Sequence, residues 1–218
     1  MTELAAAPVS TAPAPGRRAL LAHALRLEYL TVGWNVVEGV VAVAAALASG
    51  SVALLGFGID SFVESASGLV LVWRLRAEGS GSDHERIEAL ERRALKLVAL
   101  SLFLLAAFII VKAALSLWQQ DRPEVSAIGM GVTSLSIAVM WWLARAKRTA
   151  ARALGSRALE VDSFQTTACW WLSIIVLVGI GLNALFGWWW ADPVAAIAMT
   201  FFIVREGREA WEGEERAD

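Results

Sequence analysis

Two carboxylates stand one helical turn apart inside an apolar stretch of this sequence. Asp60 and Glu64 are spaced i, i+4, so in a helix both project from one face. Two carboxylates this close repel each other unless they are protonated or bridged by a cation. The spacing therefore predicts a site for a metal ion or for protons.

A second apolar stretch carries polar groups at the same kind of spacing. Asp162, Gln165 and Cys169 lie three and then four positions apart, which again places them on one helical face. A carboxylate, an amide oxygen and a thiol that faced Asp60 and Glu64 could complete a shell of four ligands. We expect two neighbouring helices to present these groups to each other.

Each of these groups also has a plainer interpretation. Cys169 alone is typical of a small buried apolar residue, and Gln165 of an interhelical hydrogen bond. Asp162 could cap the inner end of its helix beside Arg157. Glu38, on the first apolar stretch, could pack helices together or support the site from outside its ligand shell.

The composition indicates that these stretches cross a membrane. Hydrophobic residues make up 57% of the 218 residues and charged residues 18%, whereas soluble domains have about 45–50% and about 25%. These figures exclude a disordered chain and an ordinary cytosolic enzyme. The single cysteine permits no intramolecular disulfide. The net charge of −2, with no basic patch, argues against nucleic acid as a partner.

Six stretches are long enough, or nearly so, to span a bilayer, which needs about 20 apolar residues. They are residues 29–48, 52–73, 97–120, 125–144, 161–185 and 188–204. Asp192 and Pro193 lie near the start of the sixth, and this pair is typical of a helix N-cap followed by a first-turn proline. We therefore predict an all-α integral membrane protein with six transmembrane helices.

The basic residues fix the orientation of these spans. Of the 19 Lys and Arg residues, all but Lys112 and Arg122 fall in segments on one side of the membrane. Positive residues favour the cytoplasmic side, so both termini are predicted to be cytoplasmic. We expect a flexible cytoplasmic tail (1–22), a six-helix transmembrane cation-transport domain (23–206) and a short charged cytoplasmic tail (207–218).

The charges within the spans do not balance. Their acids are Glu38, Asp60, Glu64 and Asp162, and Lys112 is the one base assigned to a span. A charge at the bilayer centre costs at least about 2.5–3.5 kcal/mol. Because Lys112 can neutralise at most one acid, three carboxylates lack a basic partner, which indicates a cation or proton site.

Several segments resemble the cation diffusion facilitator (cation efflux) family. Residues 49–55 (SGSVALL) and 60–64 (DSFVE) resemble its second-helix signature, 158–169 its fifth-helix signature, and 189–196 (WWADPVAA) the entry to its sixth helix. Asn35 matches an asparagine common in the first helix of the family. The resemblance covers residues 28–206, and a short form without the family's cytoplasmic C-terminal domain is expected.

The resemblance implies export of divalent metal ions, usually zinc, in exchange for protons. The family's second-helix pair of acids falls on Asp60 and Glu64, and its fifth-helix pair of ligands on Gln165 and Cys169. Asp162 matches an acid that often precedes the latter pair. The family usually has Asp for Glu64, His or Asp for Gln165, and Asp for Cys169, so the ligand set is altered.

The resulting expectation is a transporter, not an enzyme, that moves a divalent cation by alternating access. Zinc is favoured, with manganese, iron and cadmium as further candidates, because a thiol suits softer ions and carboxylates suit harder ones. Protons, the lipid bilayer and a second copy of the chain, docked through membrane helices, are the expected partners, and a bacterial plasma membrane the expected location. Alternatives are a metal-binding regulatory subunit without transport, a manganese- or iron-type transporter, a passive cation channel and an intramembrane enzyme; the last is disfavoured because neither histidine lies in a span.

Overall fold

The described residues, 15–80 and 84–215 of the computed structural model, form six long helices. These are α1 (Pro15–Ser49), α2 (Val52–Ser80), α3 (His84–Gln119), α4 (Ala127–Leu154), α5 (Arg157–Phe186) and α6 (Ala191–Glu215). The predicted all-helical fold with six helices is confirmed.

Glycine and serine lie at several of the described helix ends. Gly50, Gly155 and Gly187 follow α1, α4 and α5 with φ values of 75°, 63° and 66°, a left-handed conformation that glycine adopts without steric cost. Ser126 and Ser156 cap the next helices, each accepting a hydrogen bond from a backbone N–H of the first turn. Local sequence thus ends one helix and starts the next within a few residues.

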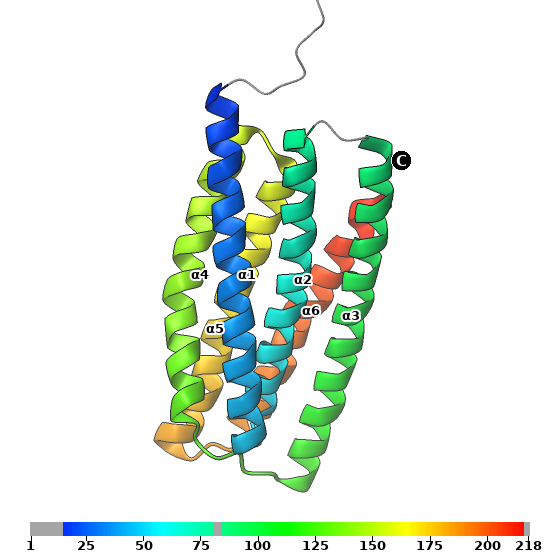
Figure 1. Ribbon diagram of the computed structural model, residues 1–218. Coiled ribbons are helices and arrows are strands. Elements are labelled where there is room, and N and C mark those ends of the chain that lie inside the picture. The colour runs from blue at the N-terminus through cyan, green and yellow to red at the C-terminus, as the bar shows by residue number, and fades with distance from the viewer. Residues whose placement is uncertain (1–14, 81–83, 216–218) are drawn as a thin grey trace, which may run out of the picture.

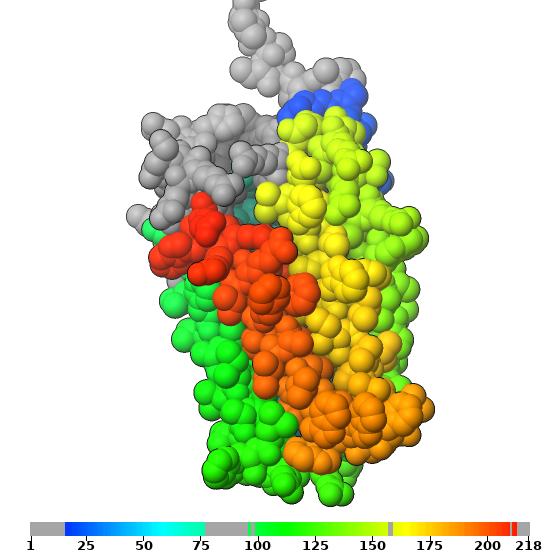
Figure 2. All heavy atoms as spheres, turned by 180° about the vertical axis from the view of Figure 1, so that it is seen from behind, coloured from blue at the N-terminus to red at the C-terminus, as the bar shows by residue number. Residues whose placement is uncertain are grey.

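The helices form a four-helix bundle with a helix pair beside it. Figure 1 shows α1, α2, α4 and α5 packed together, while α3 and α6 lie against each other along the flank of α2. Seen from behind, α6 runs diagonally between α3 and α5 (Figure 2). The start of α1 and the end of α6 lie at the same end of the molecule, as predicted from the basic residues.

Glycines on α2 allow its neighbours to approach closely. A Cβ on Gly58 would lie 2.8 Å from Val43 Cγ2 of α1, and one on Gly56 would lie 2.7 Å from Ile109 Cδ1 of α3. Real Cβ atoms essentially never show contacts this short. Close packing of small residues is typical of transmembrane helix interfaces, and here it fixes α2 at the centre of the fold.

The exterior is apolar and the interior is partly charged. Large apolar side chains point outward, among them Leu104, Ile128 and Phe201, which are 64%, 68% and 70% exposed. Several acidic side chains, such as those of Glu28, Glu38 and Asp60, lie inside instead. This distribution suits a lipid surrounding, and the chain is an integral membrane protein.

Five of the helices, α1 to α5, are long and apolar enough to cross a membrane. The sixth predicted span is a helix, but it is not among these five, because its apolar part ends at Arg205 and α6 continues with charged residues to Glu215. Helical structure also begins at Pro15, inside the stretch expected to be a loose tail. Residues 1–14 of that stretch lie outside the described residues.

Candidate functional site

A stripe of polar residues follows the buried face of α1. Glu28, Thr31, Asn35 and Glu38 are each at most 2% exposed. They recur every three or four positions, the spacing of one helical face. Because α1 contacts both α2 and α4, this stripe faces the interior of the four-helix bundle.

The acidic pair of α2 faces the interior too. Asp60 is 3% exposed and Glu64 is 6% exposed. Both oxygens of Glu64 are buried without a hydrogen-bond partner. The thiol of Cys169, on α5, lies near enough to interact with the Glu64 carboxylate, so the structure brings together these two of the predicted ligands.

Gln165 touches α2 slightly further toward the cytoplasmic end. Its side-chain oxygen accepts a hydrogen bond from the Ser67 hydroxyl at 3.4 Å, and the contact is partly buried. The interhelical hydrogen bond expected as the plainer interpretation is therefore present. It also holds an amide oxygen within one helical turn of the Glu64 position along α2.

Glu38 joins the interior from α1. One of its oxygens accepts a hydrogen bond from Ser61 at 3.4 Å, and the other is buried without a partner. Asn35, which is fully buried, has neither its amide nitrogen nor its amide oxygen satisfied. Unsatisfied buried polar groups are costly and uncommon, so these atoms, with those of Glu64, are free to bind a ligand.

Asp162 is engaged differently from the other predicted ligands. The Lys147 ammonium of α4 donates to Asp162 at 2.5 Å and to Glu28 at 3.0 Å. The lysine side chain is fully buried, as is that of Glu28. Ser156 caps the helix, so the plainer interpretation of Asp162, as a cap of its own helix, is wrong.

The sequence places Lys147 among arginines in a cytoplasmic loop, after the fourth predicted span, which ends at residue 144. The structure shows that this prediction is wrong. Helix α4 continues through Leu154, which keeps Lys147 in register with its buried face. Met140, Leu143 and Ala151 flank it on that face at helical spacing. The periodicity of the apolar residues, continued past residue 144, would have predicted that Lys147 is buried. The polar spacing on α1, continued toward its start, would have predicted the same for Glu28.

Lys112, the base assigned to a span by sequence, is exposed on the surface of α3. Within the described part of the four-helix bundle, Lys147 is the fully buried base, and it pairs with Glu28 and Asp162. The buried carboxylates of Glu38, Asp60 and Glu64 form no salt bridge with a base among the described residues. Three of the four acids assigned to spans by sequence thus lack a basic partner, as predicted, but the base is Lys147, the paired span acid is Asp162, and Glu28 is a further partner.

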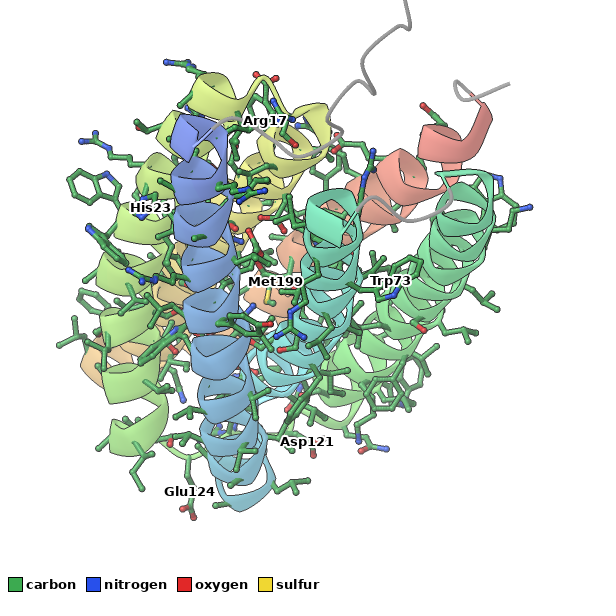
Figure 3. All side chains as sticks on the ribbon, turned by 45° about the horizontal axis from the view of Figure 1, so that its top comes forward. Arg17, His23, Trp73, Asp121, Glu124 and Met199 are labelled. Carbon is green, nitrogen blue, oxygen red and sulfur yellow. The ribbon has the colours of Figure 1, made fainter. Side chains whose placement is uncertain are left out.

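Asp192 lies at the opposite end of the bundle. Its carboxylate accepts hydrogen bonds from the Ser51 hydroxyl and from the backbone N–H groups of Val52 and Ala53, the latter two at 2.8 and 3.3 Å. It therefore caps α2, whereas sequence predicted that it would cap its own helix. In Figure 3, Asp121 lies near this end of the molecule.

The candidate ligands surround a common interior without closing on one point. In the described part of the chain, no group of three or more His, Cys, Asp or Glu side chains is arranged to hold a metal ion. Glu64 and Cys169 are neighbours, Glu38 meets α2 at Ser61, and Gln165 meets it at Ser67. Small helix movements would be needed to bring these donors onto one ion.

Comparison with known proteins gives one family. Residues 29–212 match the model of the cation efflux transmembrane domain. An uncharacterized transporter of Synechocystis sp. is 29% identical over 170 residues, covering 73% of this chain and 52% of the relative. The cation-efflux pump FieF of Shewanella oneidensis is 26% identical over 169 residues, covering 76% of this chain and 56% of the pump.

A third relative is an uncharacterized transporter of Methanocaldococcus jannaschii. It is 25% identical over 182 residues, which cover 81% of this chain and 63% of the relative. The chain thus spans between about half and under two thirds of the length of these relatives.

Proposed function

The chain belongs to the cation efflux family, and on that premise we propose that it exports a divalent transition-metal cation from the cytoplasm. The observation that carries the proposal is the surplus of buried acid. Glu38, Asp60 and Glu64 lie inside the bundle without a basic partner among the described residues. Buried charge of one sign is retained at a cost when it serves an ion pathway.

The donor set suits a transition metal. Asp60 and Glu64 supply carboxylate oxygens one turn apart, and Cys169 supplies sulfur beside Glu64. Gln165 adds an amide oxygen from the same helix as the thiol. Thiolate ligands favour zinc and cadmium, while carboxylate and amide oxygens also suit manganese and iron(II); we propose zinc as the main substrate.

Protons are the proposed counter-substrate. A buried carboxyl without a base avoids the cost of a buried charge by binding a proton. Metal ligands must be deprotonated, so an entering cation releases those protons. Gln165 cannot titrate and Asp162 is held by Lys147; among the remaining acids, Glu38, Asp60 and Glu64, we propose Glu38 and Glu64 as the main proton carriers.

The helix movements of alternating access would also bring the proposed ligands onto one ion. The proposed ligands lie on α1, α2 and α5, and α2 contacts both α1 and α5. A cation that draws Glu64, Cys169 and Gln165 together would shift α5 against α2. We propose that this shift opens one side of the membrane while it closes the other, and that dimers form through membrane helices in the plasma membrane.

Zinc uptake into proteoliposomes tests the proposal. The Asp60→Asn variant removes one ligand charge at nearly constant volume, and Asp121→Asn, at an exposed position outside the bundle, is the matched control. We expect a pH gradient to drive zinc uptake by the wild type and the control, with a loss of about 100-fold in Asp60→Asn. Equal uptake in Asp60→Asn and wild type would contradict the proposed site.

The same assay separates the alternatives. Zinc binding without uptake would indicate a metal-binding subunit, and uptake that ignores the pH gradient would indicate a passive channel. Faster uptake of manganese than of zinc would indicate the manganese- or iron-type transporter.

A further inference from the structure

A buried charge cluster joins three helices near the cytoplasmic end of the bundle. The Lys147 ammonium of α4 contacts one carboxylate oxygen of Glu28, on α1, and one of Asp162, on α5. The side chains of Lys147 and Glu28 are 0% exposed, and that of Asp162 is 11% exposed. The cluster thus holds two carboxyl groups on one ammonium group, in a place from which solvent is nearly excluded.

The cluster adjoins the proposed metal site. A Cβ built on Gly68 would lie 3.8 Å from Glu28 Oε2, so α2 passes the cluster one helical turn after Glu64. The Lys147 ammonium also interacts electrostatically with the Glu64 carboxylate. An ion leaving Glu64 toward the cytoplasm through the interior of the four-helix bundle would meet this cluster first.

We propose that Lys147 is a tethered cation that closes the cytoplasmic end of the ion pathway by bridging Glu28 of α1 to Asp162 of α5. The proposal rests on the transport function proposed above. While the bridge is formed, the ammonium occupies two carboxylates that a divalent cation would otherwise contact. When the bridge opens, those carboxylates guide the cation between the cytoplasm and Glu64.

The alternative is an ion pair that only holds the helices together. Apolar residues could fill such a position as well or better, because the desolvation of buried charges often outweighs their attraction. An ionic bridge differs from an apolar contact in that a competing cation can displace the ammonium from the carboxylates. The position of this bridge between the site and the cytoplasmic end therefore favours a gate.

Cys169 offers a direct probe of the gate. It is the single cysteine of the chain, it is 2% exposed, and it lies beside Glu64. A membrane-impermeant maleimide, added to either face of oriented vesicles, reaches this thiol only when that face is open. The alkylation rate from each face therefore reports which end of the pathway is closed.

Three variants of the full chain separate the two interpretations. Lys147→Met breaks the bridge but leaves two buried acids without a base. The triple variant Glu28→Gln/Lys147→Met/Asp162→Asn removes every charge of the cluster at similar volume, so we expect it to fold without an ionic bridge. Lys112→Met, at the exposed lysine of α3, is the matched control.

We expect the triple variant and any folded Lys147→Met protein to be alkylated about tenfold faster from the cytoplasmic face, because loss of buried ion pairs shifts an opening equilibrium by at least that factor. The rate from the outer face should not rise, and Lys112→Met should match wild type. A triple variant with wild-type rates from both faces would overturn the gate, and so would a rise that is equal from both faces. If the triple variant does not fold, the bridge is needed for the fold itself and the gate is equally overturned.

The outcomes are distinguishable from those of the proposed function. If wild type takes up zinc and the alkylation rates do not respond to the variants, only the gate fails. If wild type takes up no zinc, the transport function fails, whatever the alkylation rates show.

Discussion

The polar interior of this protein has two regions that differ in whether their buried acids have a built-in counter-ion. Toward the cytoplasmic end, Glu28 and Asp162 share the ammonium of Lys147. Deeper in the bundle, Glu64 has no hydrogen-bond partner and Glu38 has one oxygen without a partner. The first region carries its own cation, whereas the second is the proposed place of a mobile one.

This difference explains why acidic residues in one bundle should respond differently to substitution. Where a base is built in, removing one charge leaves another buried and unsatisfied, so stability falls. Where no base is present, neutralising an acid relieves a cost and removes a ligand. The two regions should therefore differ in the sign of the stability change and in the effect on transport.

The largest expected effect is on stability in the paired region. Lys147→Met should lower the free energy of unfolding by about 3–5 kcal/mol, because two buried carboxylates lose their counter-ion. Thermal unfolding in detergent measures this loss. Lys112→Met, at an exposed position, should change stability by no more than about 0.5 kcal/mol. Similar losses of stability in both variants would contradict a special role of the buried ion pairs of Lys147.

In the unpaired region the stability change should have the opposite sign. Glu64→Gln should raise the stability of the metal-free protein by about 1 kcal/mol, because burial of Glu64 costs either a charge or the uptake of a proton, and glutamine requires neither. Zinc uptake should fall by about 100-fold, since a ligand is lost. A Glu64→Gln protein that is less stable than wild type would show that Glu64 has a structural partner.

Cys169→Ser tests the unpaired region by exchanging the sulfur for oxygen at nearly constant volume. Exchange of sulfur for oxygen should lower the preference for zinc over manganese by about tenfold, because thiolate favours the softer ion. Competition uptake with both metals measures the ratio. An unchanged ratio would mean that Cys169 is a packing residue and not a ligand.

The smallest effect on transport is expected at Asp192, which is a third kind of buried acid. Its carboxylate is satisfied by donors of Ser51, Val52 and Ala53 at the start of α2. Asp192→Ala should lower stability by about 1–2 kcal/mol, as for loss of a helix cap, and leave the zinc preference unchanged. A change in metal preference would instead make Asp192 part of the pathway.

The sequence predicted the parts of the fold that depend on composition and periodicity. Long apolar stretches gave six helices, and the i, i+4 spacing placed Asp60 and Glu64 together on the buried face of α2. The close relation of Glu64 to Cys169 followed from matching the second and fifth helices. These features depend on local geometry and on the membrane as solvent.

The sequence did not reveal the features that depend on which helix faces are buried at the cytoplasmic end. Lys147 stands among arginines, so its charge indicated a loop, although its register continues the buried face of α4. Glu28 lies just before the predicted first span, where the buried stripe of α1 already runs. Their pairing with Asp162 is a long-range contact among three helices, and spacing along a single helix cannot show it.

The most direct test of the central claim is a zinc titration of the purified protein with the released protons counted. If Asp60 and Glu64 hold the cation, wild type should bind zinc and release protons as it does so, because the ligands must be deprotonated. The double variant Asp60→Asn/Glu64→Gln should lose both signals, while Asp121→Asn keeps them. Zinc binding and proton release of wild-type size in the double variant would contradict the account.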